Sequence, residues 1–210
     1  MHNEIFAYIQ AYLGDRDSYA AKIGYLPFRK RSEHINRVYV WAKRLLVEEN
    51  IQNADEESIL IAALFHDVGY AVALDGTNHA QASAEIFEKY ATEHGYDEKK
   101  KEFISYLVRN HSSKELMTHS DTPIELIILM EADLLDESGA LSIVWDCMHE
   151  GGQESPTFAQ SYDHICAYSG KILKKFPMVT PWAESVWTRK QALVREFIAQ
   201  LECDIEEDLR

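Results

Sequence analysis

The chain has 210 residues, of which 46% are apolar, and its 35 acidic residues outnumber 21 basic ones to give a net charge of −14. This apolar content excludes a disordered protein, because disordered chains have too few apolar residues to form a core. With only 9 glycines and 5 prolines, the chain is also not dominated by loops. The negative charge argues against general nucleic-acid binding, which depends on lysine and arginine. The longest apolar run, residues 59–65, is too short to span a membrane.

The N-terminus and the cysteines both favour a cytoplasmic protein. Residues 1–4 do not begin a basic segment followed by an apolar one, as a secretory signal would. Cys147, Cys166 and Cys203 are widely spaced and contain no Cys-x-x-Cys pair. We therefore expect neither a disulfide framework nor a zinc site built from thiolates.

Apolar residues recur at spacings of three and four along nearly the whole chain, and sustained strand-like alternation is absent. A hydroxyl residue followed by proline marks three helix starts, at Thr122, Ser155 and Thr180. The pattern predicts an all-α protein, a compact bundle of about nine helices. We place them at residues 3–13, 32–50, 55–66, 79–94, 97–110, 122–137, 140–149, 156–176 and 181–207.

The breaks between these helices contain no long linker rich in glycine, serine or proline, and no repeat of fixed period is present. The sequence therefore predicts a single domain over residues 1–210. The longest break, residues 14–31, ends in the basic cluster Arg29, Lys30 and Arg31. Loops of that length are more often functional than decorative.

Five helices carry a histidine or an aspartate at or near a position where an apolar residue is expected on the inward face. These residues are His34, His66 followed by Asp67, His79, His111 and Asp133. No lysine or arginine lies on the same stripes, and burying Asp67 and Asp133 without a counter-charge would cost several kcal/mol each. A divalent cation bound by imidazoles and carboxylates removes that cost.

The candidate ligands narrow the choice of metal. Two imidazoles and two carboxylates without a thiolate suit Mn²⁺, Fe²⁺, Co²⁺, Ni²⁺ or Zn²⁺, and Mg²⁺ is a further candidate. Such an ion lowers the pKa of bound water toward about 7 and neutralises phosphoryl oxygens. We therefore expect hydrolysis at phosphorus, by attack of a metal-bound hydroxide on a small phosphate ester or anhydride.

Three segments resemble the H…HD…D signature of the HD-domain metal-dependent phosphohydrolases. They surround His34, His66 with Asp67, and Asp133, at residues 33–38, 62–70 and 131–136. The resemblance implies an α-helical fold in which these four side chains bind one divalent metal ion. It also implies a metal core at residues 30–140, with the C-terminal helices 155–207 packing on it.

The likeness extends to the small bacterial HD hydrolases that include a nucleoside-triphosphate pyrophosphohydrolase, and spans residues 30–205. It implies a nucleotide as the substrate. The chain lacks the adjacent His-His pair of the cyclic-di-nucleotide phosphodiesterase branch, so His79 and His111 read better as catalytic or substrate-facing groups than as ligands of a second metal. The segment after Asp67 also lacks the glutamate of some HD nucleotidases, so a mechanism that uses it does not transfer.

Other residues complete the prediction. Arg31 and Arg37 flank the first ligand and are candidates for binding the substrate phosphates, while Asp67 could also orient or deprotonate the attacking water. A nucleotide or metal sensor without turnover is one alternative, and an iron-dependent oxygenase of the same superfamily is another. The expected partner is a small phosphorylated molecule, with neither nucleic acid nor membrane, and the oligomeric state is open.

Overall fold

The structure is a computed structural model that describes residues 2–21, 24–51, 53–73, 78–171 and 177–206. The chain forms two compact units, residues 1–133 and 134–210. The predicted all-α class is confirmed, with nine α-helices in the described residues. No helix among them is both long enough and apolar enough to cross a membrane. That the two units make one domain stays a prediction.

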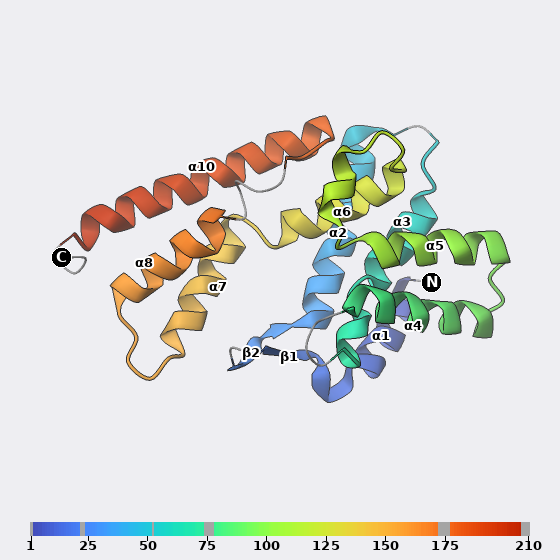
Figure 1. Cartoon of the computed structure of the whole chain (residues 1–210), viewed down its shortest axis with the longest axis horizontal. Coiled ribbons are helices and arrows are strands. Elements are labelled where there is room, and N and C mark those ends of the chain that lie inside the picture. Colours follow the sequence, from blue (N-terminus) through green and yellow to red (C-terminus); the bar gives the residue numbers. More distant parts are fainter. Residues whose placement is uncertain (1, 22–23, 52, 74–77, 172–176, 207–210) are drawn as a thin grey trace. The chain divides into compact units, whose positions relative to one another are not determined.

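Five helices and most of a sixth belong to the first unit (Figure 1). They are α1 (His2–Leu13), α2 (Arg31–Glu49), α3 (Glu56–Phe65), α4 (His79–Glu93), α5 (Glu98–Asn110) and α6 (Ile124–Asp136). Short 3-10 turns η1 (Gly14–Arg16), η2 (Val68–Ala71) and η3 (Lys114–Thr118) lie between them. The helix α3 contacts both α2 and α5, and α4 contacts α5 and η2. Helix α3 therefore lies among several neighbouring helices.

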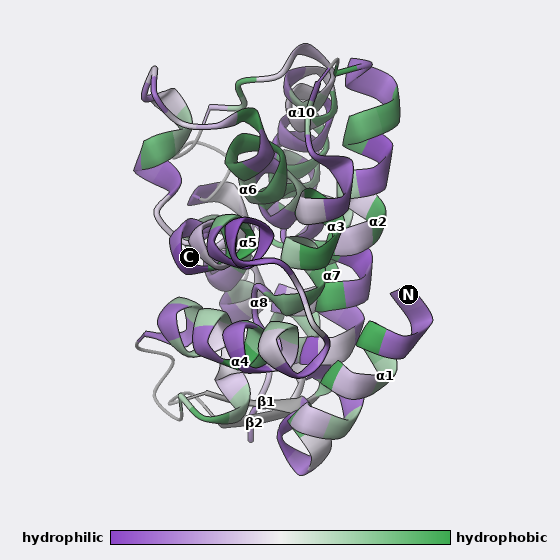
Figure 2. Ribbon diagram, turned by 90° about the vertical axis from the view of Figure 1, so that its right-hand side faces the viewer, coloured by the Kyte–Doolittle hydropathy of each residue, from purple (hydrophilic) through white to green (hydrophobic). Residues whose placement is uncertain are grey.

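The core of this unit is formed by the apolar residues that the helical spacing predicts to face inward. Ile35, Phe65, Phe87 and Leu107 are fully buried. Residues 126–130 of α6 are buried without a break, and Figure 2 shows this helix as one of the most hydrophobic. A polar side chain that extends from α6 therefore enters a largely apolar environment, where it needs a partner.

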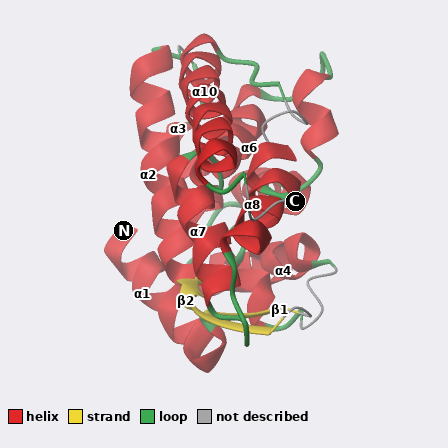
Figure 3. Cartoon of the chain, turned by 90° about the vertical axis from the view of Figure 1, so that its left-hand side faces the viewer, coloured by secondary structure: helices red, strands yellow, loops and turns green. Residues whose placement is uncertain are grey.

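Residues 14–31, which the sequence predicts to be a loop, contain a β-hairpin instead. Strand β1 (Ser18–Ala21) pairs antiparallel with β2 (Gly24–Lys30), with Tyr19 opposite Leu26 (Figure 3). The prediction of a loop was wrong because two strands of this length satisfy their backbone groups by pairing with each other. They need no long apolar alternation, which is the signal by which strands are usually found.

Asp17 lies just before the hairpin in the chain and anchors the start of α2, which follows the hairpin. Its carboxylate accepts hydrogen bonds from the backbone nitrogen and the hydroxyl of Ser32, both at 2.6 Å, and its carbonyl accepts one from the backbone nitrogen of Arg31 at 2.7 Å. The residue next to the helix, Lys30, makes no capping hydrogen bond. Asp17 thus replaces a local N-cap and fixes the turn of α2 from which His34 extends.

The second unit contains α7 (Ala140–Gly151), α8 (Phe158–Ala167) and α10 (Pro181–Asp204). The predicted start at Thr180 and Pro181 is confirmed. The start predicted at Ser155 is wrong, because Thr157 caps α8 and forms a capping box with Gln160. The helix predicted over residues 156–176 ends early, at Ala167, and its last five residues lie outside the described part of the chain.

The third predicted helix start is also displaced. Helix α6 begins at Ile124, and the hydroxyl of Thr122 donates a hydrogen bond to the carbonyl of Leu116 at 2.6 Å. The carbonyl of Pro123 accepts from the backbone nitrogens of Leu126 and Ile127. Thr122 therefore closes the preceding turn instead of capping the helix, a role that the sequence does not distinguish from capping.

Candidate metal centre

The pair His66 and Asp67 lies where α3 ends and the chain turns into η2. Nδ1 of His66 lies 2.8 Å from the carbonyl oxygen of Ala63. A carbonyl oxygen only accepts, so this ring nitrogen carries the proton, and Nε2 has a lone pair whenever the ring is neutral. Burial lowers the pKa of His66 to about 3, despite the neighbouring Asp67 and Asp133. At neutral pH a bare imidazole nitrogen therefore points into the cluster.

The structure brings together the four residues that the sequence singles out as metal ligands. Nε2 of His34 lies 3.2 Å from Nε2 of His66, 3.4 Å from Oδ2 of Asp67 and 3.3 Å from Oδ1 of Asp133. Nε2 of His66 lies 3.7 Å and 3.8 Å from the same two oxygens. These residues come from α2, the end of α3 and α6, and the sequence separates the first from the last by about a hundred positions.

These spacings fit one shared cation. Ligand atoms that bind an ion at about 2.1 Å lie about 3.0 Å apart in an octahedron and about 3.4 Å apart in a tetrahedron. The neutral His66 also directs its lone pair toward two carboxylates, which is unfavourable unless a positive charge lies among them. The set of two imidazoles and two carboxylates suits a divalent ion of intermediate hardness.

Two cations near the cluster correct the assumption that its carboxylates lack counter-charges. Nη1 of Arg31 lies 2.5 Å from Oδ2 of Asp67, and Nζ of Lys114 lies 2.7 Å from Oδ2 of Asp133. Burial alone would raise the pKa of Asp67, yet His66 and Arg31 hold it well below its usual range. Lys114 and His34 likewise outweigh the effect of burial on the pKa of Asp133 and lower it. Both carboxylates are therefore charged at neutral pH.

The other oxygen of Asp67 faces the two remaining histidines. Oδ1 lies 3.3 Å from Nε2 of His111 and 3.5 Å from Nε2 of His79, and these two nitrogens are 3.3 Å apart. Nδ1 of His111 donates to the carbonyl oxygen of Val108 at 2.7 Å, so its Nε2 also faces the cluster. Asp67 thus separates two groups of nitrogen atoms, one beside each carboxylate oxygen, and the second group has spacings that would also fit an ion.

The site is closed on the side of His66 and open on the side of His79. The side chains of His66 and His111 are at most 1% exposed, whereas those of His79 and Asp133 are 16% and 17% exposed. The ring of His79 stacks on Tyr70, at 4.3 Å between centroids. A substrate therefore approaches most easily along His79 and Asp133.

Most of these side chains extend from helix ends. His34 is in the first turn of α2, His66 follows α3, His79 is the first residue of α4 and His111 follows α5. Gly69 lets the turn after Asp67 approach α4: its backbone nitrogen donates to the hydroxyl of Ser83 at 2.8 Å, and a Cβ there would lie 2.5 Å from the nitrogen of Ser83. The close contact fixes the distance between Asp67 and His79.

The two arginines that the sequence suggests for phosphate binding are placed differently. Arg31 is buried, pairs with Asp67 and lies over the ring of Tyr70, 3.9 Å from its centroid. Arg37 is half-buried on α2, one turn after His34. That Arg31 and Arg37 bind the phosphates of a substrate stays a prediction. Lys114 is a residue that the sequence analysis missed, because its turn, η3, has no helical stripe that would point it inward.

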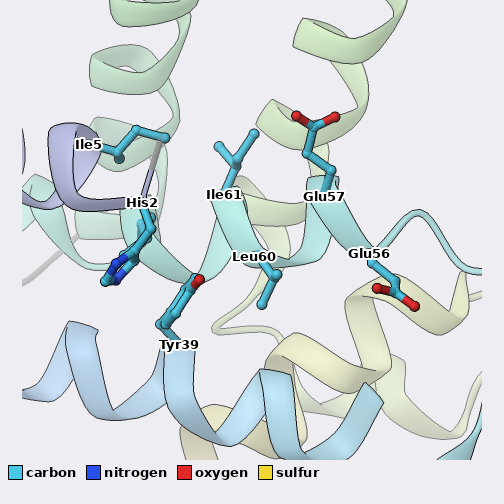
Figure 4. Close-up of a pocket in the computed structure, with 8 residues that line it drawn as sticks. His2, Ile5, Tyr39, Glu56, Glu57, Leu60 and Ile61 are labelled. Atoms are coloured by element: carbon cyan, nitrogen blue, oxygen red, sulfur yellow. The ribbon is translucent and has the colours of Figure 1, made fainter. Parts of the chain in front are cut away.

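A separate pocket lies elsewhere in the same unit. It has a volume of about 290 Å³ and lies between α1, α2 and α3, where Tyr39 points toward His2 and stacks on it (Figure 4). Its other lining residues are Ile5, Glu56, Glu57, Leu60, Ile61 and Leu64. None of them belongs to the His–Asp cluster, so this pocket is not part of the candidate metal centre.

The fold and the cluster define a known class of protein. The family model of the HD domain matches residues 31–138, a range that contains His34, His66, Asp67 and Asp133. The chain therefore belongs to the HD domain family, and the predicted resemblance is confirmed at that level. Among curated proteins nothing matches the chain significantly.

Solved structures share the fold over nearly the whole chain. An HD-superfamily hydrolase from Bacillus thuringiensis has a TM-score of 0.69 at 20% identity, covering 99% of this chain and 97% of its own. A predicted HD superfamily hydrolase from an uncultured Thermotogales bacterium has a TM-score of 0.66 at 22% identity, covering 96% and 91%. Bacillus subtilis YpgQ in complex with ADP has a TM-score of 0.66 at 22% identity, covering 97% and 94%. At these identities the likeness shows the fold.

Proposed function

We propose that this HD-domain protein is a metal-dependent phosphohydrolase that acts on a nucleotide. The observation that carries the proposal is the convergence of His34, His66, Asp67 and Asp133 on one centre, with the bare nitrogen of a neutral His66 facing two charged carboxylates. That arrangement is unfavourable in the absence of a cation and favourable with one.

Once bound, a divalent ion supplies a nucleophile at neutral pH by lowering the pKa of water, and it offsets the charge on phosphoryl oxygens. The protein provides the surrounding groups. Oδ1 of Asp67 faces away from the four-ligand centre and is positioned to orient a water molecule or to accept its proton. Arg31 keeps that carboxylate charged and in place.

The open side of the site supplies groups for the leaving oxygen. His79 is the more exposed of the two additional histidines, so we assign it the protonation of the leaving oxygen. His111 is buried and lies beside Ser112, whose hydroxyl is 3.1 Å from Nε2 of His111 and 3.0 Å from Nε2 of His79. We assign His111 the role of positioning the ring of His79 and the charged carboxylate of Asp67. Lys114, beside Asp133, is well placed to neutralise a phosphate.

A nucleotide is the substrate class that the observations favour. One structure with the same fold, YpgQ, is in complex with ADP, and the more exposed side of the present site holds His79 and, beside Asp133, Lys114. Phosphate groups are bound by such cations and proton donors. The products would be a shorter nucleotide and either phosphate or pyrophosphate.

A second ion is a refinement that one observation supports. Oδ1 of Asp67 and the Nε2 atoms of His79 and His111 lie 3.3 to 3.5 Å apart, so these three residues would hold a second ion. In that arrangement His79 and His111 are ligands instead of acid–base groups. The metal content of this centre distinguishes the two cases: compared with the wild type, His111→Gln binds one ion fewer per chain if the site is binuclear, and the same number if it is mononuclear.

The test begins with metal-free protein, to which Mn²⁺ is added back while release of phosphate and pyrophosphate from nucleoside di- and triphosphates is measured. We expect turnover that saturates with Mn²⁺. Asp67→Ala should abolish it together with metal binding at this site, and Asp121→Ala, an exposed aspartate in the same unit, should have no effect. Absence of metal-dependent release from every nucleotide and from generic phosphodiesters would contradict the proposal.

The same experiment separates the alternatives. A sensor would be stabilised by a nucleotide without forming a product. An iron-dependent oxygenase would consume oxygen when Fe²⁺ and an organic substrate are supplied, with no release of phosphate. Because all three use the same ligands, the product formed and the oxygen consumed decide among them.

A further inference from the structure

A second group of histidines and carboxylates lies in the other unit, residues 134–210. Asp146, His149 and Glu150 extend from α7 at helical spacings of three and four, which places them on one face. His164 extends toward them from α8, the helix that packs against α7 (Figure 1). The sequence indicates a surface position for His149 and places none of these residues in a site, whereas the structure half-buries His149.

The ligand atoms of this group converge on Glu150. Oε1 of Glu150 lies 3.0 Å from Nδ1 of His149 and 2.7 Å from Nδ1 of His164. Nε2 of His164 lies 3.4 Å from Oδ1 of Asp146. Ligand atoms from His149, Glu150 and His164 all lie within 4.8 Å of one another. Atoms gathered this closely can share a single ion that binds nitrogen and oxygen at about 2.0 to 2.2 Å.

The carboxylates of this group are largely shielded from solvent, and their basic partners are histidines. The side chains of His149, Glu150 and His164 are 13% to 16% exposed, and that of Asp146 is 7% exposed. Throughout the described part of the chain, neither Asp146 nor Glu150 forms an ion pair with a lysine or an arginine. This differs from the HD site, where Arg31 and Lys114 compensate the two aspartates. A buried and a half-buried carboxylate this close together are therefore favoured by positive charge from the histidines or from an ion.

Hydrogen bonds alone do not satisfy the group. Asp146 accepts from the backbone nitrogen and the hydroxyl of Ser169. When Nδ1 of a neutral His164 donates to Glu150, its Nε2 carries a lone pair that faces Asp146. Within the described residues, Nε2 of His149 is buried and has no hydrogen-bond partner. The network is thus either a charged His164 between two carboxylates or a metal site.

We propose that His149, Glu150 and His164, with Asp146 in support, bind one transition-metal ion of the Zn²⁺ type that links α7 to α8. Two imidazoles and one carboxylate are a ligand set that zinc uses in proteins. The ion removes the repulsion between Asp146 and Glu150, and it joins two helices that the chain connects only through residues 152–157. The site is distinct from the HD centre and does not rest on the function proposed for that centre.

The test compares the Zn²⁺ content of wild-type protein and of His164→Gln after equilibrium dialysis. We expect the variant to lose one bound ion per chain, while His119→Gln, which changes an exposed histidine of the first unit, loses none. Equal Zn²⁺ content in the wild type and His164→Gln would overturn the proposal and would favour the charged histidine between two carboxylates.

A second measurement isolates this site from the HD centre. In Asp67→Ala, whose HD centre is impaired, Zn²⁺ at a hundredfold excess over the dissociation constant should raise the thermal midpoint by about 5 to 10 °C. Adding Glu150→Gln, which keeps the shape of the side chain and removes its charge, should abolish the shift. Circular dichroism verifies that each variant is helical, and should His164→Gln fail to fold, Glu150→Gln replaces it in the dialysis. A shift of the same size with and without Glu150→Gln would contradict the assignment.

Discussion

Nζ of Lys114 lies 2.7 Å from Oδ2 of Asp133, while Oδ1 of the same carboxylate faces His34. The two oxygens of Asp133 thus serve different partners: one is neutralised by an amine, and the other remains directed at the candidate metal centre. A lysine in this position can act on a phosphate group without displacing the ion. Its effects on metal binding and on hydrolysis should therefore be separable.

Replacing Lys114 with methionine tests this separation. We expect kcat/KM for the nucleotide to fall at least tenfold, because a cation beside the phosphate is lost. Metal affinity should stay the same or increase, since Asp133 no longer shares its charge. Steady-state kinetics and equilibrium dialysis measure the two effects, and Lys101→Met, which removes an ion pair with Glu98 on α5, is the control. Loss of the metal with kcat unchanged would assign Lys114 to positioning Asp133.

Gly69→Ala should destabilise the protein by about 3 kcal/mol and weaken metal binding. An added methyl group would overlap the carbonyl oxygen of His79 and lie 2.5 Å from the nitrogen of Ser83, so the turn after Asp67 must move away from α4. Urea unfolding measures the free energy, and metal content reports the effect on the site. Gly151→Ala, where a Cβ meets nothing within 4 Å, should leave both unchanged. Equal stability of the two variants would show that the contact is not tight.

Asp17→Ala should lower the free energy of unfolding by about 1 to 2 kcal/mol, as loss of a helix cap does. The substitution removes the acceptor for the backbone and hydroxyl groups of Ser32 and loosens the first turn of α2. Because His34 belongs to that turn, metal affinity should fall as well. Asp17→Asn, which keeps one acceptor, should be intermediate in both measurements. Full metal affinity in Asp17→Ala would mean that His34 is positioned by its other neighbours.

The metal-free protein should lose stability in mild acid because of His66. Its pKa is about 3 in the folded protein, so the folded state stays neutral where the unfolded state, with an ordinary pKa of about 6.5, binds a proton. This contribution is absent above about pH 6.5, and below it the free energy of unfolding falls by about 1.4 kcal/mol per pH unit until about pH 3.

Urea unfolding at several values between pH 7.5 and 4.5 measures this slope. Over most of this interval Asp67 and Asp133 stay ionised in both states, since their folded pKa values are lowered. In His66→Gln the slope should be smaller by the contribution of one group. An identical slope in the two proteins would contradict the prediction that, in this pH range, His66 binds a proton only in the unfolded state.

The sequence was sufficient to predict the helices of the metal centre because their apolar spacing is regular. Periodicity that includes His66, His79 and His111 predicts the side to which each side chain points, and the structure brings them together within a few ångströms. The remaining step, which residues meet, came from the resemblance to the HD family. Spacing along the chain does not specify how helices pack.

The residues that the sequence did not indicate lie outside regular helices or depend on a contact distant in the chain. Asp17 caps a helix that starts fourteen residues later, and Lys114 belongs to a 3-10 turn. His164 meets Glu150 only because α7 and α8 pack together. The helix starts predicted at Ser155 and Thr122 were also misplaced. Each of these residues precedes a proline but does not cap the following helix.

The four histidines of the candidate metal centre lie in the first turns of α2 and α4 or directly follow α3 and α5. The hydrophobic interior depends instead on residues in the middle of those helices, such as Ala42 and Phe87. Substitutions or insertions in the connections can therefore retune the reaction while the stability of the bundle is preserved. In such an architecture a change of substrate does not require a new core.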